Sequence, residues 1–385
     1  MSGVAEAAER LARNAVDVLP EGALAEQLAL GRPLRVKFGI DPTAPDIHLG
    51  HTVVLRKLRE FQELGHQVVL IVGDYTARVG DPSGRSSIRP QADPAEIDAN
   101  ARTYEDQAFK VLDRDATEVR RNGEWLDMPM EDLFRLARTS TVAQLLERDD
   151  FAKRYAGGEP ISILELLYPL MQGYDSVAIR SDVEHGGTDH SFNLLLAREI
   201  QKAYGVEPQS MLTTPILPGI DGVQKMSKSF DNYVGVDDPP EEMFGKLMRV
   251  PDSAMPTYYE LLLDEAPGAD PRDAKRHMAR ALTARYHGEE AAGAAQDRFD
   301  TVHVRHELPD DIEEFPYNED NGQVHLPALI AEAFGLSRSE ARRLLAQGGV
   351  KLDGSELDAL DVPADQLDGV VLQVGKRRFK RLRKR

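Results

Sequence analysis

The first third of the 385-residue chain predicts an α/β fold with a parallel sheet. Residues 34–40 have the composition of a strand, Leu49–Glu63 place apolar side chains at helical spacing, and Gln67–Val72 form an apolar run typical of a buried strand. Gly65 fits the C-terminal end of the helix. The order strand, loop, helix, strand is that of a parallel nucleotide-binding unit, so we predict a Rossmann-like sheet.

The loop at residues 41–51, DPTAPDIHLGH, leads into the first turn of this helix. Free N–H groups and the helix dipole favour an anion there. His48 and His51 lie three residues apart, so both project from one side of the turn and can donate to phosphate or ribose oxygens. Gly50 leaves room for a flat base. The loop is a candidate nucleotide site, although two histidines alone also fit an ordinary exposed helix start.

The rest of the first domain has the pattern of a sheet interrupted by helices. Residues 1–33 have helical patterns, and residues 80–85 form a glycine-rich loop, GDPSGR. We predict helical structure over residues 101–175, and a short strand at 182–185 and a helix at 191–204 then complete the sheet. The helical segments within 101–175 are 101–112, 130–137 and 142–146. We therefore assign residues 1–230 to a Rossmann-like catalytic domain with a helical insertion at about 101–165.

Two further domains follow. Residues 231–305 look all-helical, and the acidic, proline-bearing stretch 307–322 looks like a linker. We assign 231–322 to an α-helical domain with its linker, and 323–385 to a small α+β domain.

The last domain carries the basic residues that an RNA-binding module needs. Ser337 and Glu340 fit a capping box. Strands are predicted at 350–354 and 370–374, and eight of the last ten residues are Lys or Arg. An isolated basic tail is more often a disordered end, but this helix, glycine turn and basic strands together resemble the ribosomal-protein-S-four-type RNA-binding module. The predicted RNA contacts are Arg342, Arg343, Lys351, Lys376, Arg377 and Arg378.

Composition narrows the class of protein. The chain has no cysteine, which excludes disulfides, thiolate metal ligands and a thiol nucleophile, and suits a reducing cytoplasm. The longest aliphatic run, residues 68–72, is too short to span a bilayer, and the first residues lack the apolar core of a secretory signal. We expect a cytoplasmic protein outside the membrane. A formal charge of −18 means that RNA contacts must use local basic patches.

A candidate small-molecule site is the segment that contains Tyr168, Gln172 and Asp175. Steps of four and three residues place all three side chains on one helical face. A phenol, an amide and a carboxylate on one face can bind a small polar ligand. The same pattern also fits an amphipathic helix whose polar residues face solvent, and these three residues alone do not separate the two interpretations.

A second motif, KMSKS at residues 225–229, favours the functional interpretation of both candidate sites. Together with HLGH at 48–51, it resembles the two ATP-binding motifs of class I aminoacyl-tRNA synthetases. The DPTA loop, GDPSG at 80–84, the YxxxQxxD helix and GGTD at 186–189 also occur in family order. Over essentially its whole length, the chain resembles bacterial tyrosyl-tRNA synthetases. It is similar to the longer-spaced branch, which lacks a tyrosine at the position of Lys37.

This resemblance implies roles for particular residues. Asp175 would take the phenol of tyrosine, and Asp189 would hold the ribose. Lys225 and Lys228 would clamp the leaving pyrophosphate. The implied catalytic residues are Thr43, His48, His51, Lys225 and Lys228. The implied ATP-binding residues are Gly39, Asp41, Gly50, Gly187, Asp189, Met226, Ser227 and Lys228. The implied tyrosine-binding residues are Lys37, Asp81, Tyr168, Gln172, Asp175 and His190.

The resemblance also implies the substrates and the assembly. These are L-tyrosine, ATP with Mg²⁺ held mostly by its phosphates, tRNA(Tyr) and a homodimer, with no tightly bound cofactor and no protein-only metal site. The helical domain at 231–322 would lie on the anticodon side of the tRNA. One departure is His190, where the family usually has Gln, and another is His185, where an aliphatic residue or Met is common. These two departures leave open the alternative that the chain is a paralogue that activates a modified amino acid. A non-catalytic RNA-binding homologue is the remaining alternative, which the paired histidines and lysines disfavour.

Overall fold

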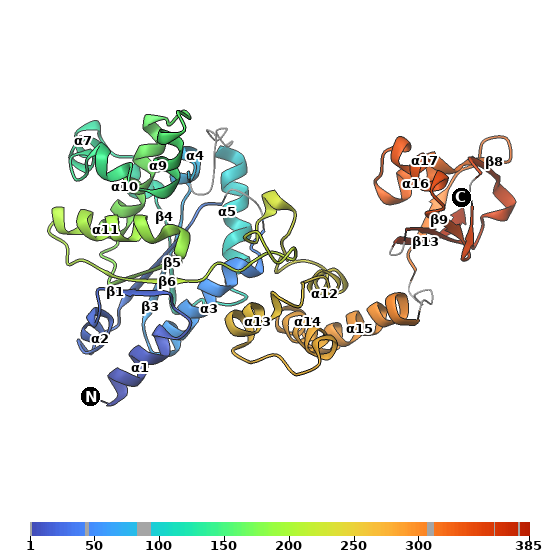
Figure 1. The fold of residues 1–385 in the computed structure, drawn as a ribbon. Helices are drawn as coiled ribbons and strands as arrows, with labels where there is room; N and C mark the ends of the chain where they lie inside the picture. The colour runs from blue at the N-terminus through green and yellow to red at the C-terminus, as the bar shows by residue number, and fades with distance from the viewer. Residues whose placement is uncertain (1, 43–45, 83–93, 306–311, 358, 376–377) are drawn as a thin grey trace. The chain divides into compact units, whose positions relative to one another are not determined.

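The computed structural model of the chain describes residues 2–42, 46–82, 94–305, 312–357, 359–375 and 378–385 (Figure 1). Packing divides the chain into two compact units, residues 1–292 and 293–385. We call them the N-terminal unit and the C-terminal unit and describe each by itself. In the described part of the chain, every helix is too short or too polar to cross a membrane.

The N-terminal unit is built on a six-stranded sheet with the order β1-β6-β5-β2-β3-β4. All neighbouring pairs are parallel except β1 and β6. The chain places β3 and β4 on one side of β2 and β5 and β6 on the other, so the strand order reverses between β2 and β5. The strands are β1 Asp17–Leu19, β2 Arg35–Ile40, β3 Gln67–Val72, β4 Thr117–Arg121, β5 Val183–Gly187 and β6 Ser210–Thr214.

Helices cover both faces of this sheet (Figure 1). Helix α3, Leu49–Glu63, packs on one face, where Val36 and Phe38 of β2 join the main apolar core. Because side chains alternate along a strand, Lys37 points to the other face, which α10 and α11 cover. Gly173 lets α10 and α11 pack closely, since a Cβ there would be 3.2 Å from the backbone of Ala197.

The remaining helices before residue 231 lie between or beside the strands of the six-stranded sheet. Gly65, at φ +84°, ends α3 as predicted. Further helices are α1 Ser2–Ala12, α2 Ala23–Leu28, α4 Thr76–Val79, α5 Pro94–Ala108, α6 Gly123–Leu126, α7 Met130–Ala137, α8 Val142–Leu145, α9 Asp149–Ala156, α10 Ile163–Ala178 and α11 Ser191–Ala203.

Residues 231–305 are helical, as the sequence predicts. Two of the segments are π-helical, Tyr259–Leu263 and Thr301–Arg305. Before them, residues 234–236 run beside the start of α3, and the Leu49 N–H donates to the Val234 carbonyl at 2.9 Å. The α-helices are α12 Pro240–Leu247, α13 Met255–Tyr258, α14 Pro271–His287 and α15 Glu289–Asp300.

The described part of the C-terminal unit begins within α15 and contains two further α-helices, a five-stranded sheet of order β10-β9-β12-β13-β7 and a β11–β8 pair. Ser337 caps α17 by accepting from the Glu340 N–H at 3.2 Å. The helices are α16 Leu326–Phe334 and α17 Arg338–Ala346. The strands are β7 Glu314–Tyr317, β8 Gln323–His325, β9 Val350–Leu352, β10 Ser355–Glu356, β11 Asp361–Pro363, β12 Val371–Val374 and β13 Arg378–Lys384.

Eight of the described strands lie where the sequence pattern does not predict them, namely β1, β4, β6, β7, β8, β10, β11 and β13. β1 lies in the stretch 1–33 expected to be helical, and β4 lies within the expected helical stretch 101–175. β4 is a half-buried edge strand, TEVRR, whose composition gives no apolar run to recognise. β7 lies in the expected linker 307–322, and residues 306–311 are outside the described residues. β13 turns the expected basic tail into a paired strand.

Candidate active site

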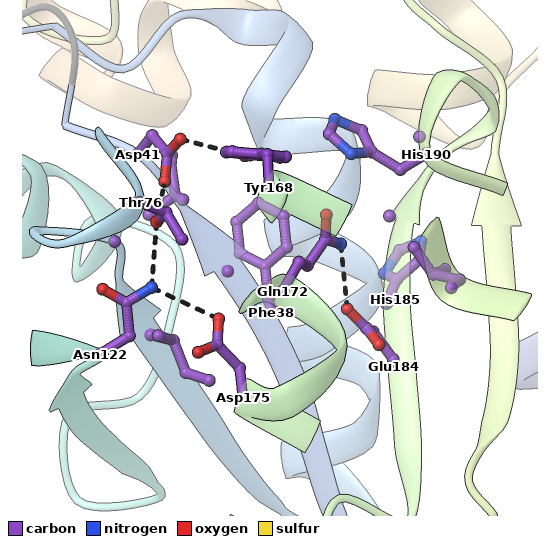
Figure 2. Close-up of a pocket in the computed structure, with 17 residues that line it drawn as sticks. Phe38, Asp41, Thr76, Asn122, Tyr168, Gln172, Asp175, Glu184, His185 and His190 are labelled. Carbon is purple, nitrogen blue, oxygen red and sulfur yellow. Dashed lines mark hydrogen bonds between the residues drawn. The ribbon is translucent and has the colours of Figure 1, made fainter. Parts of the chain in front are cut away.

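A pocket opens at the carboxyl ends of the parallel strands, near the reversal between β2 and β5 (Figure 2). Open α/β sheets bind ligands at this position. The empty volume is about 510 Å³ with the open mouth included. The lining residues are Phe38, Gly39, Ile40, Asp41, Ile71, Gly73, Thr76, Asn122, Tyr168, Gln172, Asp175, Glu184, His185, Gly186, Gly187, His190 and Leu194.

The carboxylate of Asp175 forms a buried acceptor in this pocket. It accepts a hydrogen bond from the Trp125 indole N–H at 2.8 Å and one from the Asn122 amide at 3.4 Å. Burial raises the pKa of Asp175 to about 7, against the lowering effects of Lys37 and these two donors. A buried carboxylate with free lone pairs suits a ligand that brings its own donor, such as a hydroxyl.

A chain of hydrogen bonds connects the two walls of the pocket. The Tyr168 hydroxyl donates to Asp41 at 3.0 Å, and the Thr76 hydroxyl donates to the other oxygen of Asp41 at 2.7 Å. Asn122 donates to Thr76 at 2.9 Å. Burial, and the nearby carboxylates of Asp41 and Asp81, raise the pKa of Tyr168 well above its ordinary value, so the phenol stays a donor. This part of the pocket is fixed before a ligand arrives.

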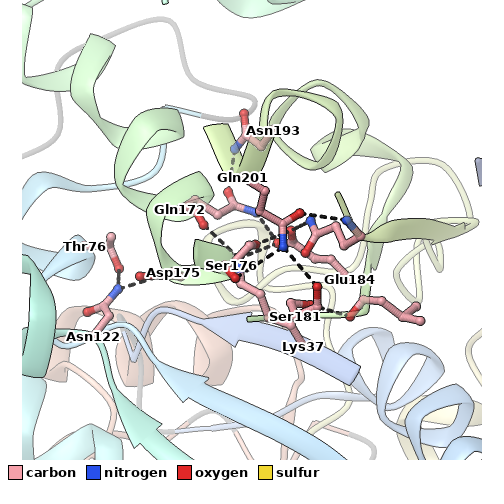
Figure 3. Close-up of polar contacts among 12 residues, drawn as sticks. Lys37, Thr76, Asn122, Gln172, Asp175, Ser176, Ser181, Glu184, Asn193 and Gln201 are labelled. Carbon is pink, nitrogen blue, oxygen red and sulfur yellow. Dashed lines mark hydrogen bonds and ion pairs between the residues drawn. The ribbon is translucent and has the colours of Figure 1, made fainter. Parts of the chain in front are cut away.

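Gln172 is held at both ends of its amide (Figures 2 and 3). Its N–H group donates to Glu184 at 3.2 Å, and its oxygen accepts from Asn193 at 2.7 Å. The oxygen keeps one lone pair for a ligand donor such as an ammonium group. Lys37 is not among the residues that line the pocket, because it lies behind the wall in an ion pair with Glu184.

Two histidines on β5 and the turn after it also reach the lining. The His190 ring nitrogen Nε2 lies 3.7 Å from Asp81 and 3.9 Å from Asp189, so it stands between the two carboxylates. Asp81 also contacts Arg148 at 3.3 Å. His185 is buried, and burial lowers its pKa to about 3, so the ring is neutral near pH 7.

The nucleotide-site candidates His48 and His51 stack on each other at the start of α3. Their ring centroids are 3.8 Å apart, and the backbone N–H of His48 donates to Nδ1 of the His51 ring at 3.2 Å. Burial lowers the pKa of His51 to about 4 and that of His48 well below its ordinary value, with Lys225 adding to both shifts. Both rings are therefore neutral near pH 7. Gly50 admits the His48 ring, since a Cβ there would be 3.0 Å from it.

We call residues 225–229 the lysine loop. Its two lysines are paired with carboxylates, Lys225 with Asp189 at 3.2 Å and Lys228 with Asp46 at 2.7 Å. Between them, Met226 is buried against the start of α3, where its Cβ lies 3.5 Å from the position of a Gly50 Cβ. The Ser227 N–H donates to Asn232 at 2.8 Å. The loop thus lies against the nucleotide-site helix through Met226.

The structure brings together most of the predicted site residues, while others lie apart from the pocket. Thr43, Lys376 and Arg377 are outside the described residues. The other predicted RNA contacts all belong to the C-terminal unit, with Arg342 and Arg343 exposed on α17. Sequence reasoning missed Thr76, Asn122, Trp125, Glu184 and Asn193. Apart from the single tryptophan as a rare residue, nothing in their local patterns marks them.

Comparisons with known proteins identify the family of the chain. The family described as tRNA synthetases class I (W and Y) matches residues 29–304. A tyrosine–tRNA ligase from Moorella thermoacetica is 53% identical over 392 residues, 97% of this chain and 94% of that protein. One from Thermotoga maritima is 50% identical over 386 residues, covering 97% and 96%.

Solved structures show the same fold. A tyrosyl-tRNA synthetase from Archaeoglobus fulgidus, complexed with L-tyrosine, has a TM-score of 0.64 at 25% identity and covers 76% of this chain and 99% of its own. A C-terminally truncated mitochondrial tyrosyl-tRNA synthetase from Aspergillus nidulans has a TM-score of 0.64 at 22% identity, covers 78% and 94%, and supports the fold alone.

The chain belongs to the class I tRNA synthetases of the tryptophan and tyrosine type. Within that class, the relatives that match almost its full length are tyrosine–tRNA ligases, and it is a member of their family. Use of ATP as a substrate follows from this membership.

Proposed function

We propose that the chain joins L-tyrosine to tRNA(Tyr) in two steps. Tyrosine reacts with ATP to give tyrosyl-adenylate and pyrophosphate, and the tyrosyl group then passes to the terminal adenosine of tRNA. The observation that carries the proposal is the buried carboxylate of Asp175, with its Trp125 donor, in a pocket lined by His190. The His190 ring lies 3.9 Å from Asp189, the carboxylate partner of Lys225. Since tRNA is charged in the cytoplasm, we propose that the protein acts there.

The amino-acid end of the pocket suits tyrosine. We assign the tyrosine phenol to Asp175, and the ammonium group to Asp81, Tyr168 and Gln172. A phenylalanine side chain brings no donor, so the buried carboxylate of Asp175 would keep only its Trp125 and Asn122 donors and leave a lone pair unsatisfied, which is costly. This is a physical reason for the pocket to select tyrosine.

The nucleotide end suits ATP. His48 and His51 are neutral, so each ring can donate one N–H to a phosphate or ribose oxygen without adding charge. We assign the ribose to Asp189, the phosphates to Thr43 and His48, and the nucleotide to His51 and to the backbone near Gly39, Asp41, Gly50, Gly187, Met226 and Ser227. Mg²⁺ belongs to the MgATP substrate and would be held mostly by the phosphates.

The first step needs little proton transfer. The tyrosine carboxylate is already a nucleophile near pH 7, and it attacks the α-phosphorus while the bond to the bridging oxygen breaks and pyrophosphate leaves with the electron pair. Catalysis then depends on positioning and on stabilising phosphate charge. Lys225 and Lys228 would exchange their carboxylate partners for the phosphates, in keeping with their exposed ion pairs. We assign His190 to the neighbourhood of the tyrosine carboxylate and α-phosphate.

The test of this function is ATP–pyrophosphate exchange by the purified chain with each of the twenty amino acids, without tRNA. Exchange with tyrosine alone is the expected result. Exchange with another amino acid would contradict the tyrosine assignment and point to the His190 and His185 substitutions. Absence of exchange with every amino acid, with and without tRNA, would overturn the catalytic proposal.

We also propose that the chain forms a homodimer through the helical insertion. Among the described residues, six exposed apolar side chains lie on α7, α8, α9 and the start of α10, and of these Ile163 is 79% exposed and Phe134 60%. Apolar surface of this kind commonly marks an interface, and a second copy of the chain is the occupant that a symmetric dimer supplies. The six residues are Met130, Phe134, Val142, Tyr155, Ile163 and Leu164.

Sedimentation of matched variants tests the dimer. Phe134→Asp and Ile163→Asp are expected to give monomers, because each places a charge in the proposed interface. Val16→Asp is the control, since Val16 is 57% exposed but lies outside the insertion. A wild-type chain that sediments as a monomer, or variants that stay dimeric, would contradict the proposal.

For tRNA, we propose that the C-terminal unit supplies phosphate contacts. Arg342 and Arg343 are exposed on α17, and Arg378 is exposed at the start of β13. Lys351 of β9 lies 3.9 Å from Glu356, a loose pair that a phosphate could replace. Lys376 and Arg377 stay predicted contacts. The division into domains at residues 230 and 322 also stays a proposal.

A further inference from the structure

A buried lysine–glutamate pair lies directly behind the amino-acid end of the pocket (Figure 3). The ammonium nitrogen of Lys37 is 2.8 Å from three oxygens, which belong to Glu184, Ser176 and the backbone of Gln172. Lys37 is fully buried, and Glu184 is 2% exposed. The three donors of the ammonium group are therefore all used inside the protein.

Glu184 is equally saturated. One oxygen faces Lys37 and accepts from the Gln172 amide at 3.2 Å. The other accepts from the Ser176 hydroxyl at 3.0 Å and from the Gln209 amide. Lys37 comes from β2, Glu184 from β5 and their shared partners Gln172 and Ser176 from α10, so the pair connects the helix to the two central strands.

The position of this ion pair indicates a role other than stabilising the fold. Replacing a buried ion pair with apolar residues of similar size is often neutral or stabilising, so stability alone is a weak reason to keep one. Here both charges bind the face of α10 that carries Gln172 and Asp175, the two side chains assigned to the ends of the substrate. Ser176, which both charges contact, directly follows Asp175 in the chain.

We infer that Lys37 and Glu184 are positioning residues of the amino-acid site. Both fix Gln172 on the wall, and Lys37, which Glu184 holds in place, keeps the carboxylate of Asp175 ionised for the phenol of the substrate. Neither residue touches tyrosine in this assignment. The inference rests on the proposed tyrosine site and adds the electrostatic device behind it.

The charges around Asp175 give the direction of the effect. After burial, which raises the pKa of Asp175, Lys37 is the largest influence and lowers it, whereas Glu184 raises it to a smaller extent. Trp125 and Asn122 lower it through hydrogen bonds and carry no charge. The ionised fraction of Asp175 rises as pH rises through about 7, so tyrosine affinity should rise over the same interval.

Two variants should move this profile in opposite directions. Glu184→Gln keeps Lys37 and removes the smaller, opposing influence, so the midpoint of tyrosine affinity against pH should move to lower pH. Lys37→Met combined with Glu184→Gln removes both charges and keeps the volume, so the midpoint should move to higher pH. Each shift should be roughly one pH unit or less, and the double variant should bind tyrosine several times more weakly near pH 7.

The measurement is tyrosine binding to the full chain, followed by the fluorescence of Trp125, which is the only tryptophan and contacts Asp175. The control is Arg154→Met with Glu165→Gln, which removes a similarly buried ion pair, 2.7 Å long, between α9 and the first turn of α10, away from the pocket lining. A purely structural role predicts loss of thermal stability in both double variants and no change in either midpoint.

The outcomes separate the inference from the function on which it rests. Opposite midpoint shifts in the two Glu184 variants, with an unmoved control, support the inference. Unmoved midpoints, or shifts of one sign, overturn it. If the double variant does not fold, the direction of the Glu184→Gln shift decides alone, since an unchanged or higher midpoint contradicts the inference. A wild-type chain that binds no tyrosine would instead overturn the proposed function.

Discussion

Two lysine–carboxylate pairs at the two ends of the site have almost the same length and opposite surroundings. Lys37 and Glu184 lie 2.8 Å apart with side chains 0% and 2% exposed. Lys228 and Asp46 lie 2.7 Å apart with side chains 40% and 34% exposed. The distances do not distinguish them, but the burial does.

Burial decides whether such a pair can exchange partners. An exposed pair contributes about 0–1 kcal/mol, because water solvates both charges almost as well. A phosphate can therefore displace Asp46 from Lys228 at little cost. Removing one partner of a buried pair strands a charge without water, which typically costs about 3–5 kcal/mol. The amino-acid end is thus built to hold its shape, and the nucleotide end is built to change partners during the reaction.

The largest expected effect is on the selection of tyrosine by the amino-acid end of the site. Asp175→Asn should reduce the preference for tyrosine over phenylalanine by at least about 10²-fold, because a neutral amide is a weaker acceptor for the phenol than a carboxylate. Tyrosine enzymes of this class are themselves the known case of this selectivity, about 10⁵ against phenylalanine, and that magnitude belongs to those enzymes rather than to the geometry of this pocket. The measurement is kcat/KM for pyrophosphate exchange with each amino acid. Unchanged discrimination would remove Asp175 from the phenol site.

The second largest expected effect is on the rate of adenylate formation at the nucleotide end of the site. Lys228→Ala should slow adenylate formation by about 10²–10³-fold, the usual loss when one charge-stabilising group is removed. Tyrosine affinity should stay nearly constant, because Lys228 pairs with Asp46 and is not among the residues that line the amino-acid end. Single-turnover formation of the adenylate and equilibrium binding of tyrosine measure the two quantities. An equal loss of tyrosine binding would contradict the division into two ends.

A third expected effect lies on the exposed arginines of the C-terminal unit. Arg342→Ala with Arg343→Ala should lower the salt dependence of tRNA binding by about one unit of log–log slope per lost phosphate contact. Pyrophosphate exchange should be unchanged, since both arginines lie outside the N-terminal unit. Glu332→Ala with Asp365→Ala, at two exposed acidic residues of the same unit, controls for general effects of surface charge. An unaltered slope would exclude these arginines as phosphate contacts.

Removal of residues 376–385 is not a clean test of the same contacts. In this segment, Leu382 is fully buried. The basic side chains of Lys380, Arg383 and Lys384 form ion pairs with Glu313, Glu314 and Glu319, respectively. Loss of β13 would expose the core of the C-terminal unit, so a fall in tRNA affinity would not separate RNA contact from unfolding.

The smallest expected effect tests the weak pair directly. Asp46→Asn removes the carboxylate that competes with ATP for Lys228, and a pair worth about 0–1 kcal/mol allows at most roughly fivefold tighter ATP binding. The KM for ATP in pyrophosphate exchange measures this change, with tyrosine KM as the internal control. A loss of ATP affinity would mean that Asp46 contributes to ATP binding and is not a competing partner.

Local pattern predicted the elements nearest the site with good accuracy. The predicted bounds of α3 and β3 are those of the structure, and β2 begins one residue after its predicted start. These segments carry strong periodicity or a continuous apolar run, because they are buried on one or both faces. β1, β4, β7 and β13 are short, mixed or charged strands at or near sheet edges, where pairing with a neighbour determines the conformation.

The same division holds for the site. The sequence by itself determined the family motifs and the three side chains on one face of α10, because helical spacing is local. Only the tertiary structure decided that Trp125 and Asn122 would bind Asp175, and that Lys37 would lie behind the wall with Glu184. Partners from separate strands and helices meet only when the sheet is assembled, and burial, which sets their charge states, exists only in the folded protein.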